Sequence, residues 1–139
     1  MYPASRYGPE PLVDLQSRAA REKLSPSALK GFFRIAERWN LPDEAARDLL
    51  GGISNGTLYN LRNRPKTLRA DELLRVSYLI GIFKALHILY SERLADAWMQ
   101  LPNTNPIFRG GTPLAYARAG GIPALQTVRR LLDARRGGA

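Results

Sequence analysis

The sequence predicts an all-α protein, and three observations carry that prediction. Hydrophobic residues recur at intervals of three and four through most of the chain, which is the spacing of one face of a helix. Serine, threonine or acidic residues stand at the start of these segments, and glycine or proline stands after them, as at helix ends. No segment has a convincing strand pattern.

Composition narrows the kind of protein further. The 139 residues, 45% of them hydrophobic, suffice for one ordinary domain or for two small units that share a core. With no cysteine and a single histidine, His87, disulfides, zinc sites and a histidine-based catalytic set are improbable, so we expect no metal and no cofactor. No run reaches the roughly 20 apolar residues of a membrane span, and the N-terminus lacks the apolar core of a signal peptide, so we expect a cytoplasmic protein.

The positive charge is clustered, which matters more than its total of +9. Residues 49–70 contain four basic residues and no acidic one: Arg62, Arg64, Lys66 and Arg69. A second group lies near the C-terminus, where Asp133 is the one acidic residue among four arginines: Arg129, Arg130, Arg135 and Arg136. Clustered cations attract phosphate backbones, so the charge pattern favours a nucleic-acid ligand.

The N-terminal part is expected to contain one firm helix. Residues 1–23 are interpreted as a flexible segment, with a short helix after residue 11 as an open alternative. The firm helix is expected to begin at Ser25, whose hydroxyl suits an N-cap, with Pro26 at the first helical position. Its inner face has apolar residues at three-to-four spacing: Leu29, Phe32, Phe33, Ala36 and Trp39.

Residues 24–68 are predicted to form a helix-turn-helix unit. A short helix beginning near Asp43 ends at Gly51-Gly52, and a second one covers residues 54–63, ended by Pro65. In such units the second helix lies in the major groove of DNA. With Leu58 and Leu61 facing inward, the candidate contacts to operator DNA are Ser54, Asn55, Thr57, Tyr59, Asn60, Arg62, Arg64 and Lys66. A helical hairpin with a solvated basic face is the alternative.

The longest predicted helix covers residues 71–90 and is hydrophobic almost all round, so it belongs at the centre of a bundle or in a homodimer contact. Gly81 inside it suggests close approach by another backbone. His87 is interpreted as a hydrogen-bonded core residue. A further helix, capped by Ser91, is expected to direct three side chains inward: Leu94, Trp98 and Leu101.

Residues 101–121 hold three prolines, four glycines and two asparagines, and a last helix is expected from Pro123 to Gly137. Proline stiffens such a loop, and Asn103 and Asn105 can bond their own backbone, so the segment is predicted to have a fixed shape. Thr112 should cap a short helix over residues 113–117. Phe108 and Tyr116 are expected to serve as anchors or contacts, and a packed connection without a partner is the alternative.

The order of these segments resembles the Xre/MbcA/ParS family of type II antitoxins, over about residues 24–138. The most specific part of the resemblance is the C-terminal half, where the family order and spacing recur at Trp98, Pro102, Asn103, Gly111, Pro113, Leu114, Gly121 and residues 128–136. The resemblance implies an all-α protein with an N-terminal helix-turn-helix unit. It also implies a helical dimerisation and toxin-binding domain, which we place at residues 69–139.

For function, the resemblance implies a non-enzymatic antitoxin that obstructs the active site of a RES-domain toxin, an enzyme that degrades NAD. It further implies binding of operator DNA, repression of its own operon and a homodimeric state. The residues expected to bind the toxin are Asn103, Phe108, Arg109, Tyr116, Arg129, Arg135, Arg136, Gly137 and Gly138.

One position departs from the usual helix-turn-helix pattern. Four residues before Gly51, where a small residue is common, the chain has Arg47. Either Ala46 takes this role in a slightly longer turn, or the two helices pack irregularly.

Three other functions stay open from the residues alone. The first is a helix-turn-helix repressor without a toxin partner, and the second is a basic RNA-binding protein. An enzyme is the least supported, because neither a nucleophile with its base nor a glycine-rich phosphate loop after a strand can be assembled from these residues.

Overall fold

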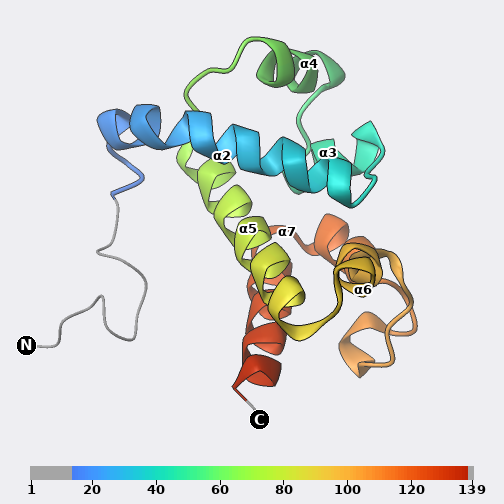
Figure 1. The fold of residues 1–139 in the computed structure, drawn as a ribbon. Coiled ribbons are helices and arrows are strands. Elements are labelled where there is room, and N and C mark those ends of the chain that lie inside the picture. Colours follow the sequence, from blue (N-terminus) through green and yellow to red (C-terminus); the bar gives the residue numbers. More distant parts are fainter. Residues whose placement is uncertain (1–13, 138–139) are drawn as a thin grey trace, which may run out of the picture.

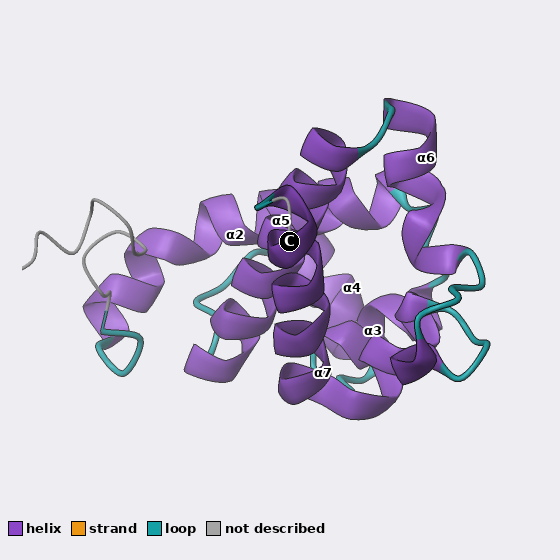
Figure 2. Ribbon diagram, turned by 90° about the horizontal axis from the view of Figure 1, so that it is seen from below, coloured by secondary structure: helices purple, strands orange, loops and turns teal. Residues whose placement is uncertain are grey.

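The computed structural model describes residues 14–137. The described elements are α2 (Arg18–Arg38), α3 (Asp43–Leu49), α4 (Asn55–Asn63), α5 (Ala70–Leu89), α6 (Glu92–Ala97), α7 (Pro113–Arg136) and the short 3-10 helices η1 (Trp98–Gln100) and η2 (Pro106–Phe108). The described part of the chain consists of helices and loops (Figure 2), which confirms the all-α prediction.

The predicted start of the first helix at Ser25 is wrong. Helix α2 begins at Arg18, and the side chain of Ser17 caps it by accepting a hydrogen bond from the backbone N–H of Ala20. Residues 18–23 of the segment expected to be flexible are therefore helical, and residues 1–13 lie outside the described residues. Pro26 sits inside α2 on an exposed position, where water can satisfy the carbonyl of Glu22 that its missing N–H leaves unbonded.

Ser25 has a tertiary role in place of the predicted cap. Its hydroxyl donates to the carbonyl of Arg21 at 2.6 Å and accepts from the N–H of Leu68 at 2.8 Å. Both Ser25 and Leu68 are buried, so this bond fixes the segment between α4 and α5 against α2.

Replacing Ser25 by alanine should lower the free energy of unfolding by about 1–3 kcal/mol, because it leaves the buried N–H of Leu68 without an acceptor. Urea denaturation would measure the change. Ser27→Ala is the matched control, since that hydroxyl is exposed and donates only to the carbonyl of Leu24 within its own helix. Equal losses in the two variants would contradict the tertiary role of Ser25.

Helix α5 is the centre of the fold, as predicted. The N-terminal end of α5 lies beneath α2, and the rest of α5 runs alongside α7 (Figure 1). Its fully buried residues are Val76, Leu79, Ile82, Ala85 and Leu86. Ile80 and Phe83 of the same helix are only half-buried. The suspected backbone contact at Gly81 is wrong, because the group that occupies the space beside it is the guanidinium of Arg129 from α7.

Helices α3 and α4 meet at the predicted glycine turn. Gly51 and Gly52 have φ values of 103° and 81°, which side chains rarely adopt, so the turn depends on glycine. Ser54 caps α4 by accepting from the N–H of Thr57 at 3.1 Å. Ala46 is 1% exposed and belongs to the core, whereas Arg47 is half-buried at its edge. Ala46 therefore takes the role of the small residue.

The connection after α6 differs from the prediction. Ala95, Trp98 and Met99 enter the core, while Leu94 and Leu101 are 39% and 43% exposed. The inward direction expected for these two leucines is wrong, because α6 ends at Ala97 and the chain continues as the 3-10 helix η1, which shifts the buried face.

Helix α7 consists of two helical stretches joined at Gly121, where φ is 64° and ψ is −147°. The first is capped by Thr112, which accepts from the N–H of Ala115, as predicted. The second contains Pro123 and buries Leu125, Val128 and Leu132 against α5. This bend lets α7 contact α3 with its first stretch and α5 with its second.

Candidate functional site

The outward face of α4 carries uncharged polar side chains. Leu58 and Leu61 point into the core with at most 1% exposure, and the residues on the opposite side are exposed. Helical spacing of three and four places four of these in one stripe: Gly56, Tyr59, Asn60 and Asn63. We call this set the α4 stripe. Tyr59 is 65% exposed, and Asn63 was missed by the sequence analysis although its spacing from Tyr59 and Asn60 could have identified it.

Of the other predicted contacts on this helix, Ser54 and Asn55 are exposed at its N-terminus, and Thr57 is half-buried beside them. Ser54 Oγ donates to Thr57 Oγ1 at 3.0 Å. These three residues adjoin the α4 stripe at the end nearest the glycine turn.

Arg62 is held against the body of the protein. Its Nη2 lies 3.3 Å from Oδ1 of Asp43 on α3, and its guanidinium carbon lies 5.0 Å from the centre of the Phe33 ring on α2. These contacts direct the guanidinium toward α2 and α3, away from the α4 stripe. The expectation that Arg62 contacts DNA stays a prediction.

Arg64 and Lys66 are exposed in the segment that follows α4. Neither forms an ion pair with another residue of the described part of the chain. Their charges therefore remain available to an external anion next to the α4 stripe.

The loop between η1 and α7 has a defined shape, as predicted. Asn103 Oδ1 accepts from the N–H of Asn105, and Asn105 Oδ1 accepts from the N–H of Ile107. The N–H of Asn103 also donates to the carbonyl of Gly111 at 3.0 Å, which closes the loop. Local hydrogen bonds thus hold a segment without regular helix in one conformation.

Phe108 anchors this loop in the core. It is 5% exposed and makes edge-to-face contacts with Trp98 and Tyr116, with ring centres 6.3 and 5.3 Å away. Arg109, the next residue, adopts a left-handed conformation with φ of 51° and is exposed. The loop therefore buries one aromatic ring and presents Ile107 and Arg109 outward on either side of it.

Large apolar side chains are exposed mainly in the C-terminal half. The structure exposes five of them in residues 14–137, and only Tyr59 lies in the N-terminal half. The others are Ile88, Leu94, Leu101 and Ile107. Exposed apolar residues of this kind are typical of protein interfaces, and the sequence analysis missed all four as candidates.

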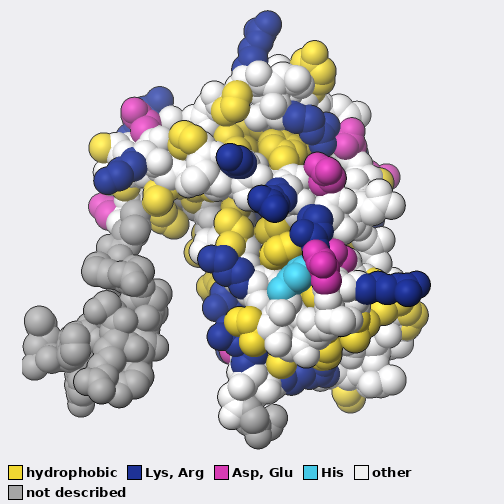
Figure 3. Space-filling model, viewed as in Figure 1, with side chains coloured by type: hydrophobic (Ala, Val, Ile, Leu, Met, Phe, Trp, Pro, Cys, Tyr) yellow, Lys and Arg dark blue, Asp and Glu magenta, His cyan; other side chains and the backbone are white. Residues whose placement is uncertain are grey.

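The predicted basic residues of α7 fall into three environments. Arg129 is half-buried beside Gly81 and pairs with Asp133 at 3.0 Å. Arg135 donates to the hydroxyl of Tyr90 at 2.7 Å, and Arg136 lies 3.7 Å from Asp133. Gly137 is exposed and Gly138 lies outside the described residues. On the face seen in Figure 3, basic side chains line the lower part of the molecule, where acidic ones are few.

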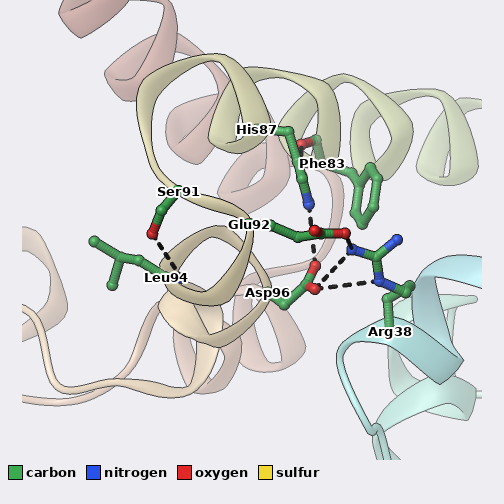
Figure 4. A network of polar contacts seen from close by, with 7 residues as sticks. All are labelled: Arg38, Phe83, His87, Ser91, Glu92, Leu94 and Asp96. Atoms are coloured by element: carbon green, nitrogen blue, oxygen red, sulfur yellow. Dashed lines mark hydrogen bonds and ion pairs between the residues drawn. The ribbon is translucent and has the colours of Figure 1, made fainter.

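A polar network joins the two halves of the molecule (Figure 4). Arg38 of α2 pairs with Glu92 and Asp96 of α6 at 2.7 and 2.8 Å. The hydrogen bond that Arg38 donates to the carboxylate of Asp96 raises the pKa of Arg38 above its ordinary value, so this guanidinium stays charged. His87 Nδ1 donates to the carbonyl of Phe83 at 2.9 Å, and its Nε2 lies 3.1 Å from Asp96. His87 is thus hydrogen-bonded, as predicted, but it is half-buried and does not belong to the core.

A second polar contact connects α7 to α3. Arg118 pairs with Asp48 at 2.9 Å and with Glu44 at 3.4 Å, and both acids belong to the first helix of the helix-turn-helix. No group of His, Cys, Asp and Glu in residues 14–137 has the arrangement of a metal site. Over the same range, the helices are too short or too polar to cross a membrane.

Comparison with known proteins matches two consecutive parts of the chain to two family models. Residues 16–81 match the family model of the antitoxin Xre-like helix-turn-helix domain. Residues 84–138 match that of the antitoxin Xre/MbcA/ParS C-terminal toxin-binding domain. The chain is also similar to the uncharacterized protein y4oB of Sinorhizobium fredii, with 39% identity over 114 residues that cover 81% of this chain and 87% of the relative. No solved structure was found to match the chain.

Proposed function

Because the chain belongs to the Xre/MbcA/ParS family of antitoxins, we propose that it neutralises a RES-domain toxin that degrades NAD. The antitoxin obstructs the active site of this toxin, and it binds operator DNA to repress its own operon in the cytoplasm. It acts by binding and not by catalysis, and it needs no cofactor. The observation that carries the proposal is the match of residues 84–138 to a toxin-binding domain, within which four exposed apolar side chains and a shaped loop lie.

DNA binding is assigned to α4 and the segment after it. The outward position of the α4 stripe suits entry into the major groove. Arg64 and Lys66 follow the helix with free charges, so they contact the phosphate backbone beside the groove. The acid-free run of residues 49–70 keeps this surface free of repulsion toward phosphate.

Removing the charges of Arg64 and Lys66 together should weaken binding to all DNA sequences alike. It should also make the slope of the logarithm of the binding constant against the logarithm of salt concentration shallower, by the amount expected for about two lost phosphate contacts. Fluorescence anisotropy over a series of salt concentrations would measure both effects. The matched control replaces Lys84 and Arg93, two exposed cations on α5 and α6. Equal affinity of the Arg64 and Lys66 double variant and the wild type would contradict this assignment.

The protein is proposed to bind a palindromic operator as a homodimer, since two-fold symmetric operators are read by two-fold symmetric proteins. Helix α5 supports this with Ile88, which is 63% exposed near its C-terminal end. Solution scattering should give twice the 15.5 kDa mass of the chain. A monomer mass at operator-binding concentrations would remove this part of the proposal.

Toxin binding is assigned to the loop and to the second stretch of α7. Asn103 and Phe108 hold the loop in shape, while Ile107, Arg109 and Tyr116 offer apolar and charged contacts to the toxin. Arg129 positions α7 against α5. Arg135, Arg136 and the glycines after them lie at the mouth of the NAD pocket in this proposal.

Co-expression with the product of a neighbouring RES-domain gene provides the test. We expect the two proteins to purify as one complex and the complex to lack NAD-degrading activity. A chain that binds operator DNA but never retains the RES-domain protein would instead support a repressor without a toxin partner.

A further inference from the structure

We propose that the operator bases read by α4 are predominantly A·T pairs. The inference deepens the DNA-binding part of the proposed function and rests on it. It concerns which base edges the exposed side chains of this helix can recognise.

The α4 stripe contains no charged side chain. Gly56, Tyr59, Asn60 and Asn63 are all exposed, and their spacing places them on the side of the helix opposite Leu58 and Leu61. Asn55 lies four positions before Tyr59, at the same edge of the stripe as Arg62. The surface that would enter the groove therefore offers amide groups and one phenol ring.

The nearby cations do not lie on this stripe. Arg62 is directed toward the Phe33 ring and Asp43, as the 5.0 Å and 3.3 Å distances show. Arg64 and Lys66 follow the last residue of α4, beyond the helical face that carries the stripe. Arginine and lysine are the side chains that most often recognise the O6 and N7 atoms of guanine, and the one such residue of α4, Arg62, is turned toward Asp43 and Phe33 in this structure.

The side chains that are available match adenine and thymine. An asparagine amide recognises adenine by donating to N7 and accepting from the N6 amino group. The side chains of Asn55 and Asn60 form no hydrogen bond with any other described residue, so both amides are free for such a pair. Asn63 already donates to the carbonyl of Tyr59 at 2.8 Å, which holds its amide in place. The exposed ring of Tyr59 suits apolar contact with the methyl group of thymine.

Selection from a pool of random DNA duplexes by the full-length protein tests the inference first. We expect the selected half-site to contain a run of A·T pairs where α4 binds. A consensus with G·C pairs at those positions, lost in the variant Arg62→Ala, would overturn the inference and leave the DNA-binding proposal intact. No selection of any sequence would mean that the DNA-binding proposal itself fails.

Single-atom changes in the selected duplex then test the side chains. Replacing adenine by 7-deazaadenine removes N7, and at one position this should weaken wild-type binding by about 5- to 150-fold while leaving the binding of Asn60→Ala unchanged. Replacing thymine by uracil removes the methyl group, and it should weaken binding by the wild type but not by Tyr59→Ala. Lys84→Ala, which replaces an exposed cation on α5 outside the proposed DNA-binding surface, is the comparison variant and should respond to both changes as the wild type does. If 7-deazaadenine weakened binding of the wild type and of Asn60→Ala equally at every position, the assignment of Asn60 to an adenine would be overturned.

Discussion

Replacement of Phe108 by alanine is expected to lower the free energy of unfolding by about 3–5 kcal/mol and to abolish toxin binding. The ring is 5% exposed and packs between Trp98 and Tyr116, so its loss leaves a cavity beneath the loop. Because the loop is proposed to contact the toxin, its distortion should also remove that surface. Chemical denaturation and co-purification with the toxin would measure the two effects.

The neighbouring residue provides the matched control. Ile107 is 36% exposed, so Ile107→Ala should change the free energy of unfolding by no more than about 0.5 kcal/mol. If its side chain contacts the toxin, this variant should still weaken the complex. A stable Ile107→Ala protein with wild-type toxin affinity, together with a stable Phe108→Ala protein, would contradict the proposed roles of both residues.

Deletion of residues 135–139 is expected to restore NAD breakdown while the antitoxin remains bound to the toxin. Arg135 and Arg136 are exposed at the end of α7, and the deletion removes no buried residue of the described chain. The fold and the loop surface should therefore persist. Association is measured by co-purification and enzyme activity by NAD consumption.

Arg135→Ala is the control that distinguishes loss of the tail from loss of its contact with Tyr90. It removes this hydrogen bond and keeps the chain length. Because Arg136 and the residues after it remain, this variant should inhibit the toxin more strongly than the deletion variant does. Full inhibition by the shortened protein would contradict a role of the tail in the active site. Loss of association would also contradict it, because the tail would then be needed for docking.

Much of the fold could be predicted because its signals are local. The caps at Ser54 and Thr112 and the glycine turn each depend on residues within a few positions of one another. The central position of α5 followed from the excess of apolar residues along it. These features require no knowledge of tertiary contacts.

The wrong predictions concern residues whose positions depend on tertiary contacts. The Ser-Pro pair at residues 25–26 looks like a helix start, but the hydroxyl of Ser25 bonds a buried N–H that lies 43 positions away in the chain. The space beside Gly81 is filled by Arg129 from another helix, which no local pattern indicates. Leu94 and Leu101 fit a helical period that ends when η1 begins. The contacts of Arg62 with Asp43 and Phe33 were likewise invisible in the sequence.

The most direct test of the account is titration of the purified RES-domain toxin with this protein while NAD consumption is followed. We predict that NAD breakdown falls in proportion to added antitoxin and stops when the binding sites of the toxin are filled. Unchanged NAD breakdown in a mixture that forms a stable complex would contradict the claim that the antitoxin obstructs the active site.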